Sequence, residues 1–380
     1  MRPTVLALIF VSLTVFLAAS CGSNNTTTNP PPPQCTPASP PAFAYALTGN
    51  SSNIVASFTQ DSCTGALDVT SPASVMTGFN SEEMVADPKG RFLYVANIVS
   101  NASDQATISM YTIDSTTGAL TPTSPPTVPT GFLPQGIGID PTGHFVYTAN
   151  SDGNNVSMFT VDQTTGVLTP TSPPTVAAGS SPGTLVVHPS GKYVYVTNQD
   201  DGTISMYNVN PSTGVLTPMN PPTVYGGSGF QMTIDPAGKN LYAPNTYSNN
   251  TVSQFTIDPN TGALSTDPVS SVATGQQPVW IAFTPSGNYA YVVNRADATV
   301  SMYSVNSSTG DLVPLSAAPI AAGGLPWPIA IDSLGKFAYV GDEAGSQVVI
   351  YTINADGTLT GAGAASPGAG TNDVVTVAPQ

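Results

Sequence analysis

The residues best suited to chemistry are one arginine, two tryptophans and a small set of acids and amides. Arg295 could hold an anion, while the carboxylate of Glu82 or Asp373 could act as a general base. Trp280 and Trp327 are the only tryptophans of the chain, and each offers an apolar face to a ligand. The remaining binding candidates are polar side chains: Gln135, Gln231, Glu83 and Glu343. This set predicts a site for a small polar organic ligand or a peptide.

These residues occupy related places in a repeat that occurs seven times. Each copy contains a short aromatic-rich phrase of three residues, such as Phe92-Leu93-Tyr94. The last residue of this phrase is always a tyrosine: Tyr45, Tyr94, Tyr147, Tyr195, Tyr242, Tyr291 and Tyr339. A unit of roughly 50 residues accommodates four short strands and their turns, which is one propeller blade. The sequence therefore predicts an all-β fold, a seven-bladed β-propeller with four-stranded blades, as a single domain over residues 42–380.

The two ends of the chain predict how the ring closes. The first unit begins at its second strand, with Phe43-Ala44-Tyr45, and lacks an innermost strand. The chain finishes with an unassigned strand over residues 373–379. We expect this strand to become the innermost strand of the first blade, because closure removes the free edges of an open stack.

One face of the predicted ring should carry the site. The links between consecutive blades share a face with the connections from second to third strands; Trp280 and Trp327 end such links, and Arg295 follows a second strand. The other basic residues of the domain lie at turns of the opposite face. Acids and amides at matching positions complete the expected depression: Glu82, Glu83, Gln135, Gln231, Asn372, Asp373, Asp342 and Glu343.

Composition excludes nucleic-acid binding and argues against a zinc site. The chain has 7 basic residues against 22 acidic ones, a formal net charge of -15, so it lacks the basic surface that nucleic-acid binding requires. With only His144 and His188 and no Cys-x-x-Cys, it has too few ligands for a zinc site. We interpret both histidines as structural. The Asn- and Asp-rich loops 150–155 and 198–202 lack the spacing of an EF-hand. We expect no cofactor and no metal.

The N-terminus predicts export to the cell envelope. Residues 1–20 hold an apolar run that ends in Ala18-Ala19-Ser20-Cys21, which is typical of a lipoprotein signal peptide with lipidated Cys21. An ordinary secretory signal is the alternative. Residues 21–41 are rich in Pro, Asn and Thr and predict a tether. In an oxidising compartment Cys35 and Cys63 are expected to form a disulfide. We expect a monomer on the periplasmic or cell-surface side, attached to the membrane only by its lipid.

Two phrases carry a resemblance to a known family. Tyr195-Val196-Thr197-Asn198 spells the signature of the Tyr-Val-Thr-Asn (YVTN) repeat proteins, and the stretch 278–294 resembles the seven-bladed lactonase propellers related to 6-phosphogluconolactonase. The resemblance implies a propeller and lactone hydrolysis, with His, Glu and Arg drawn from loops at the channel mouth. This sequence departs from it at the positions after the strand-opening prolines, which hold residues such as Gln135 where a His is expected. The family's catalytic residues therefore cannot be transferred by position.

Three functions remain open on this sequence. The favoured one is a ligand-binding or protein-interaction module at the cell envelope, whose partner is a small polar ligand or an envelope protein. The alternatives are a lactone hydrolase, in which Glu82 or Asp373 acts as base and Arg295 holds an anion, and a structural surface protein without a channel ligand. Under the binding reading Trp280, Trp327 and Arg295 contact the ligand. Under the structural reading the two tryptophans pack the wall of the funnel and Arg295 neutralises nearby acids.

Overall fold

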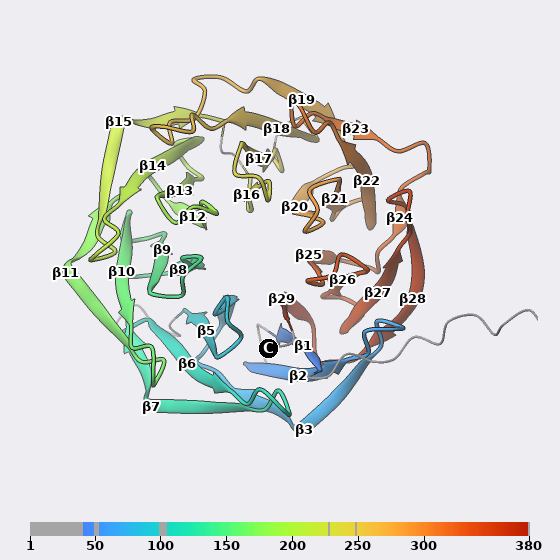
Figure 1. Cartoon of the computed structure of the whole chain (residues 1–380), viewed down its shortest axis with the longest axis horizontal. Helices are drawn as coiled ribbons and strands as arrows, with labels where there is room; N and C mark the ends of the chain where they lie inside the picture. Colours follow the sequence, from blue (N-terminus) through green and yellow to red (C-terminus); the bar gives the residue numbers. More distant parts are fainter. Residues whose placement is uncertain (1–40, 49–52, 99–104, 227–228, 248, 379–380) are drawn as a thin grey trace, which may run out of the picture. The chain divides into compact units, whose positions relative to one another are not determined.

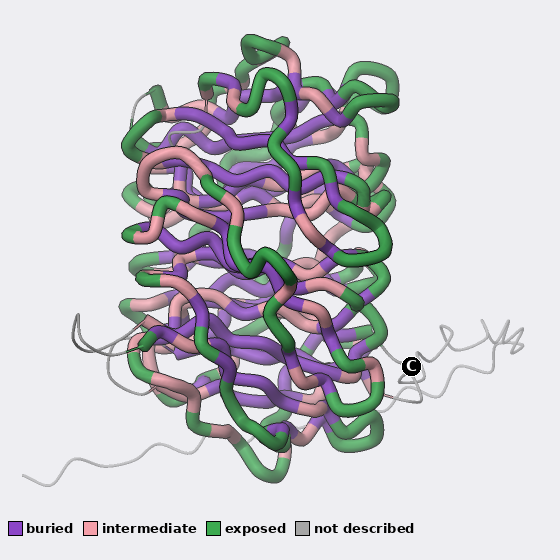
Figure 2. Tube along the Cα trace, turned by 90° about the vertical axis from the view of Figure 1, so that its left-hand side faces the viewer, coloured by how far each residue is buried: buried purple, intermediate pink, exposed green. Residues whose placement is uncertain are grey.

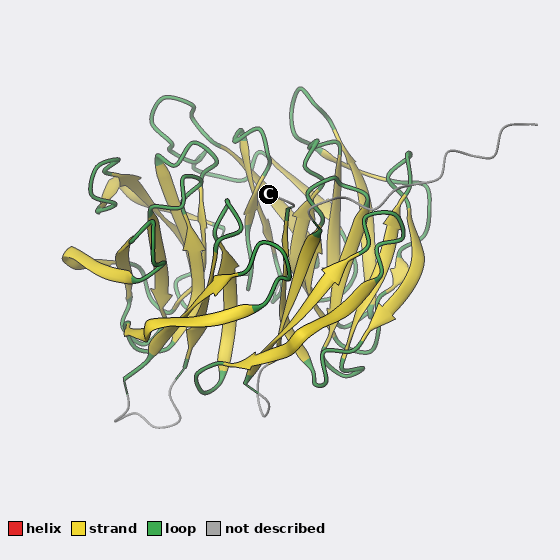
Figure 3. Cartoon of the chain, turned by 60° about the horizontal axis from the view of Figure 1, so that its bottom comes forward, coloured by secondary structure: helices red, strands yellow, loops and turns green. Residues whose placement is uncertain are grey.

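The computed structural model describes residues 41–48, 53–98, 105–226, 229–247 and 249–378. The described chain is built of strands joined by turns and loops, with no helix among these residues (Figure 3). Accordingly, no described segment forms a helix that is long and apolar enough to cross a membrane. The predicted signal peptide, Cys21, Cys35 and all of the predicted tether except Pro41 lie outside the described residues.

Seven antiparallel sheets are arranged in a ring, each with its strands ordered from the centre outward (Figure 1). The first four blades are β29(Thr371–Val377), β1(Ala42–Thr48), β2(Ile54–Gln60) and β3(Leu67–Met76); β4(Ser81–Ala86), β5(Phe92–Asn97), β6(Thr107–Ile113) and β7(Leu120–Pro129); β8(Pro134–Ile139), β9(Phe145–Asn150), β10(Asn155–Val161) and β11(Leu168–Ala177); β12(Pro182–Val187), β13(Tyr193–Asn198), β14(Thr203–Val209) and β15(Leu216–Tyr225). In these blades the second strands are buried and the outer edge strands carry prolines, which cannot donate to a neighbouring strand.

The last three blades are less regular. They comprise β16(Thr233–Ile234), β17(Asn240–Pro244), β18(Thr251–Thr256) and β19(Ser270–Ala273); β20(Pro278–Phe283), β21(Tyr289–Asn294), β22(Thr299–Val305), β23(Leu312–Pro314) and β24(Ile320–Ala321); β25(Pro326–Ile331), β26(Phe337–Asp342), β27(Gln347–Ile353) and β28(Leu359–Ala365). In the sixth blade two short strands, β23 and β24, both pair with β22 and share the outer edge. In the fifth blade the innermost strand is only two residues long, which leaves the residues before it in a loop.

The ring closes as predicted. Strand β29 pairs with β1, from Phe43 opposite Val377 to Thr48 opposite Thr371, so the last strand of the chain is the innermost strand of the first blade. The seven-bladed, four-stranded architecture and this closure are therefore both confirmed.

The repeated tyrosines latch each blade to the next. Each of the seven repeated tyrosines is fully buried, and its hydroxyl donates to the backbone carbonyl of a turn glycine in the following blade, over 2.6 to 3.0 Å. Tyr45 donates to Gly118 and, at the other end of the series, Tyr339 donates to Gly65 of the first blade. A buried phenol needs such a partner, and these bonds explain why the tyrosine recurs in every copy.

The apolar core lies between the blades. Tyr147 and Val156 of the third blade pack with Leu185 and Val194 of the fourth, and comparable clusters fill the other junctions. Figure 2 shows the burial along the chain: buried residues lie mainly in the extended segments, and exposed residues lie mainly in the turns and loops. We call the edge at which the innermost strands begin the mouth face, and the opposite edge the turn face.

Candidate functional site

The innermost strands bulge where they meet the mouth face. Their pairing with the second strands shifts register near the first residues in six blades, for example between Ser81 and Glu83 and between Pro278 and Trp280. A bulge sets an extra residue into one strand and re-aims the side chains beside it. Consecutive residues such as Glu82 and Glu83 can consequently both line the central cavity.

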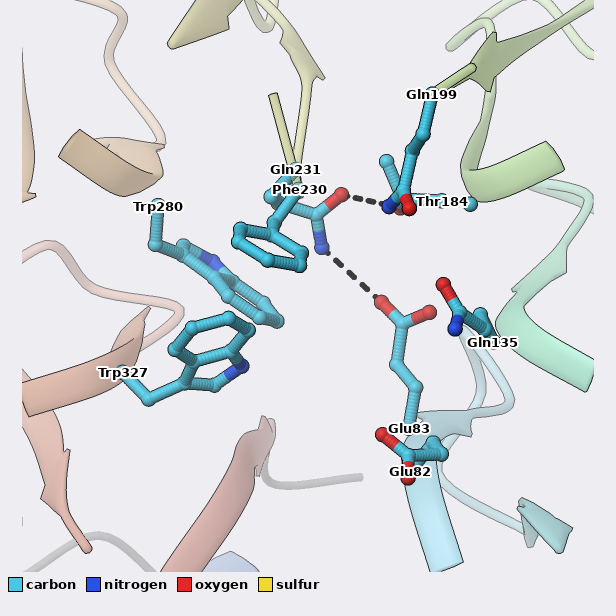
Figure 4. Close-up of a pocket in the computed structure, with 10 residues that line it drawn as sticks. Glu82, Glu83, Gln135, Thr184, Gln199, Phe230, Gln231, Trp280 and Trp327 are labelled. Atoms are coloured by element: carbon cyan, nitrogen blue, oxygen red, sulfur yellow. Dashed lines mark hydrogen bonds between the residues drawn. The ribbon is translucent and has the colours of Figure 1, made fainter. Parts of the chain in front are cut away.

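A cavity of about 200 Å³ opens on the mouth face. Figure 4 shows its two unlike walls, with Phe230, Trp280 and Trp327 gathered on one side and the acids and amides on the other. The lining residues are Glu82, Glu83, Gln135, Gly183, Thr184, Gln199, Phe230, Gln231, Trp280 and Trp327. The structure thus brings together six of the binding candidates that the sequence singled out.

A second depression of about 180 Å³ adjoins this cavity. It is lined by Glu82, Arg295, Trp327, Glu343 and Asn372, so Glu82 and Trp327 belong to both spaces. Arg295 is the only basic residue of the described chain that lines either one. We refer to the two spaces together as the mouth site.

The guanidinium of Arg295 is held in place by the last blade. Its Nη2 lies 2.6 Å from a carboxylate oxygen of Glu343, and its central carbon lies 4.8 Å from the centroid of the Trp327 ring. The other terminal nitrogen, Nη1, is buried and has no hydrogen-bond acceptor among the described residues. Arg295 therefore stacks on Trp327 of the next blade and not on Trp280 of its own, and it keeps one donor unused.

Glu82 is the carboxylate available to a ligand. Its side chain makes no hydrogen bond to any described residue, although it is half buried in the mouth site. Burial and, to a lesser extent, the negative charge of Glu343 raise the pKa of Glu82 above its usual value of 4.5. A carboxylate with a raised pKa and unused acceptors is suited to general-base chemistry.

Glu83 and Gln231 form a bar across the channel beneath the cavity. The amide nitrogen of Gln231 donates to Glu83 Oε1 over 3.0 Å, and the backbone amide of Ile137 donates to Glu83 Oε2 over 2.9 Å. The hydroxyl of Thr184 donates to Gln231 Oε1. Three blades thereby meet at one carboxylate, and Thr184 of a fourth blade is joined to it through Gln231. Glu83 and Gln231 also line a second space further along the channel.

The structure corrects the sequence-based hypothesis that Asp373 could be the base. Its side chain does not line the mouth site: it is 2% exposed, and its two oxygens accept backbone hydrogen bonds from Met84 and Val374. Burial raises the pKa of Asp373 to about 7, and burial together with the charge of Asp373 raises the pKa of Glu83 to about 8. Asp373 is therefore a buried neighbour of Glu83 and does not face a ligand.

Asp342, which the sequence placed at the depression, does not line the mouth site. Its carboxylate accepts hydrogen bonds from the backbone amides of Gly324 and Leu325, which fixes the loop between the sixth and seventh blades. Asparagines fill the same slot in other blades; Asn198, for example, accepts from Gly179 and donates to Thr203 and Ser205. These side chains hold the mouth-face loops together.

Neither histidine reaches the mouth site. His188 bonds to Ser190 and to the carbonyl of Gly238, and His144 bonds to Thr142, all at turns of the turn face. Within the described ranges, no group of three or more His, Cys, Asp or Glu residues is placed to hold a metal ion. Cys63 is disulfide-bonded. Because Cys35 is outside the described residues, its pairing with Cys63 stays a prediction.

Besides Gly183, which has no side chain, three lining residues of the cavity escaped the sequence reasoning. Gln199 directly follows the second-strand Asn198 just as Arg295 follows Asn294, so this shared slot was a signal that could have identified it. Thr184 occupies the bulged start of β12, and Phe230 precedes the short β16. Thr184 stands two residues after Pro182, as Trp280 does after Pro278, so this slot could have identified it. No motif marks Phe230, since its place depends on the local path of the chain.

The sequence matches the family described as "Lactonase, 7-bladed beta-propeller" over residues 39–178, 169–283 and 265–375. No curated protein matches the chain significantly. Among solved structures, a candidate 6-phosphogluconolactonase from Bacteroides fragilis shares 22% identity at a TM-score of 0.74, covering 90% of this chain and 99% of its own. A periplasmic gluconolactonase from Pseudomonas aeruginosa shares 18% identity at a TM-score of 0.74, covering 89% and 99%. At these identities the structural likeness establishes the fold.

Proposed function

The chain belongs to the lactonase family of seven-bladed β-propellers, and we propose that it hydrolyses a lactone bound in the mouth site. One observation carries this proposal beyond family membership: Glu82 and Arg295 line the same depression. A carboxylate without a hydrogen-bond partner among the described residues thus shares a space with a guanidinium that has a donor to spare. Ester hydrolysis needs these two kinds of group.

In the proposed reaction Glu82 is the general base. It accepts a proton from a water molecule as the water oxygen attacks the lactone carbonyl carbon. The proton then passes to the ring oxygen when the bond between that oxygen and the carbonyl carbon breaks. The product is an open-chain hydroxy acid, and Glu82 returns to its carboxylate form. A raised pKa makes Glu82 a stronger base than an ordinary surface carboxylate.

Arg295 is proposed to stabilise the oxyanion that develops on the carbonyl oxygen. The ion pair with Glu343 and the ring of Trp327 fix its guanidinium before substrate arrives, and such preorganised charge contributes strongly to catalysis. The buried Nη1 has no acceptor among the described residues, and a bound carbonyl oxygen that reaches it would satisfy this donor.

A binding module at the cell envelope is the second candidate. It is supported by the aromatic wall of Phe230, Trp280 and Trp327, which a ligand could occupy without reacting. A panel of unsubstituted and sugar lactones, assayed by acid release from the purified protein, separates the two candidates. Turnover above the uncatalysed rate supports a hydrolase, whereas saturable binding without turnover supports the binding module. If the protein shows no turnover and no binding, a structural surface protein is favoured.

The cellular location is also a proposal. An apolar run followed by Cys21 supports export with lipid attachment at that cysteine. Incorporation of labelled palmitate into the expressed chain, and its loss in Cys21→Ser, is the expected result. Equal labelling of the variant would overturn the lipoprotein assignment.

A further inference from the structure

We propose that the mouth site takes an uncharged, polyhydroxylated lactone ring, such as a sugar lactone without a phosphoryl group. The lactone part of this inference rests on the proposed function, but the polyol and the absence of negative charge are argued from the lining alone. Three features of the cavity carry it: one aromatic wall, one wall of unused polar groups, and an excess of carboxylates over cations.

The aromatic wall suits the apolar face of a saturated ring. Phe230 meets Trp327 edge-on with ring centroids 4.9 Å apart, and Trp280 belongs to the same partly buried cluster. Figure 4 shows these rings turned toward the acid and amide side across the cavity. The ring C–H groups of a sugar lactone present a flat apolar surface to such a wall, and a cavity of about 200 Å³ has room for a single ring.

The facing wall offers hydrogen bonds that the protein does not use. No described residue bonds to the side-chain amides of Gln135 or Gln199 or to the carboxylate of Glu82. Each amide can both donate and accept, and the carboxylate accepts. These amides and this carboxylate lie opposite the aromatic wall. They match a ring that bears several hydroxyl groups, because each hydroxyl can both donate and accept a hydrogen bond.

Charge argues against a phosphorylated ligand. Glu82, Glu83 and Glu343 line the two depressions or their floor, and Asp373 lies buried beside Glu83. The charge of the one guanidinium that the described residues bring to the lining is offset by Glu343 at 2.6 Å, and its Nη1 is left as a donor for a single ligand oxygen. Burial and neighbouring acids raise the pKa of Glu82 and of Glu83, so the site resists even its own negative charges. A phosphoryl group with a charge near -2 would meet the same two costs, the loss of its hydration and repulsion by the neighbouring acids.

The first test compares three substrates by kcat/KM: an aldono-δ-lactone, its 6-phosphorylated form and δ-valerolactone, which has no hydroxyl groups. We expect the unmodified sugar lactone to exceed both others by at least about tenfold, equivalent to ~1.4 kcal/mol. A phosphorylated lactone that is used as well or better would overturn the inference while leaving lactone hydrolysis intact.

The second test measures binding without reaction. Both tryptophans of the chain line the cavity, so their fluorescence reports on its occupancy. The probe is an aldonolactam, in which NH replaces the ring oxygen and hydrolysis is blocked. Saturable quenching by this lactam, but not by its 6-phosphorylated form, is expected. This result in a protein that hydrolyses no lactone would uphold the polyol site and remove the enzymatic proposal.

Two variants and a control sharpen the assignment. Gln199→Leu should weaken lactam binding by about tenfold through the loss of hydrogen bonds to hydroxyls. Glu343→Gln removes one negative charge and releases Arg295, so the preference for the unphosphorylated probe should shrink severalfold. Leu334→Ala alters an exposed side chain on the turn face and should change neither. An unchanged preference in Glu343→Gln would contradict the charge argument.

Discussion

The carboxylate of Asp373 accepts a 2.8 Å hydrogen bond from the backbone amide of Met84, although the two residues are 289 positions apart in the chain. This bond joins the last strand, β29, to β4 at the residue that follows Glu83, which forms part of the bar across the channel. The strand that closes the ring therefore also sets the electrostatics of the mouth site. Ring closure and site chemistry are coupled through one buried acid.

The coupling predicts an unusual dependence of stability on pH. Glu83 and Asp373 have pKa values of about 8 and 7 in the folded protein, compared with the usual 4.5 and 3.8. Between about pH 4 and pH 8 the folded state therefore holds protons that the unfolded chain has released, so the free energy of unfolding falls as pH rises through this range. Thermal melting should show a lower midpoint at pH 8.5 than at pH 5.

The matched variant for this prediction is Asp373→Asn. It removes the buried charge and keeps an oxygen that can accept a backbone hydrogen bond, so the decline between pH 5 and pH 8.5 should become shallower. Wild-type midpoints that are level or rise over this range would show that the two acids do not share a buried environment.

The proposed role of Arg295 as oxyanion donor predicts that its replacement lowers kcat. Arg295→Met keeps much of the side-chain length but removes the proposed oxyanion donor, and kcat should fall by about 100- to 1,000-fold. Arg295→Lys restores a positive charge without the planar fork and should recover only part of the rate. Initial rates of acid release check both variants. A kcat within threefold of wild type in Arg295→Met would remove Arg295 from the mechanism.

The asparagine slot predicts a purely structural effect. Asn198 is fully buried and ties Gly179, Thr203 and Ser205 together, so Asn198→Ala leaves these partners unsatisfied and should lower the free energy of unfolding by about 1–3 kcal/mol. Urea unfolding measures the change. Ligand binding by the folded variant should match wild type, and a loss of binding without a loss of stability would assign Asn198 to the site instead.

The fold was predictable from the sequence because every blade repeats the same sequence features. The tyrosine latch, the turn glycine and the strand pattern each occur in several copies, so a weak signal in one unit is supported by the others. The missing innermost strand before Phe43 and the surplus strand after Asn372 then left one way to close the ring.

The site was less predictable because its residues do not repeat. Glu82, Trp280 and Arg295 could be placed on the mouth face from their positions in the repeat. Phe230 could not, because the fifth blade departs from the pattern and β16 begins late. The burial of Asp373 also escaped the sequence, since it depends on how the register shift near Thr48 turns a side chain away from the mouth.

The central claim, that the mouth site hydrolyses a lactone with Glu82 as base, is tested most directly by initial rates of acid release from an aldono-δ-lactone. Glu82→Gln keeps the shape of the side chain and removes its basicity, whereas Asp68→Asn removes a charge from an exposed outer strand and serves as the matched control. We predict turnover by wild type and Asp68→Asn, and a fall of at least about 100-fold in kcat/KM for Glu82→Gln. Wild-type turnover that Glu82→Gln retains in full would contradict the account.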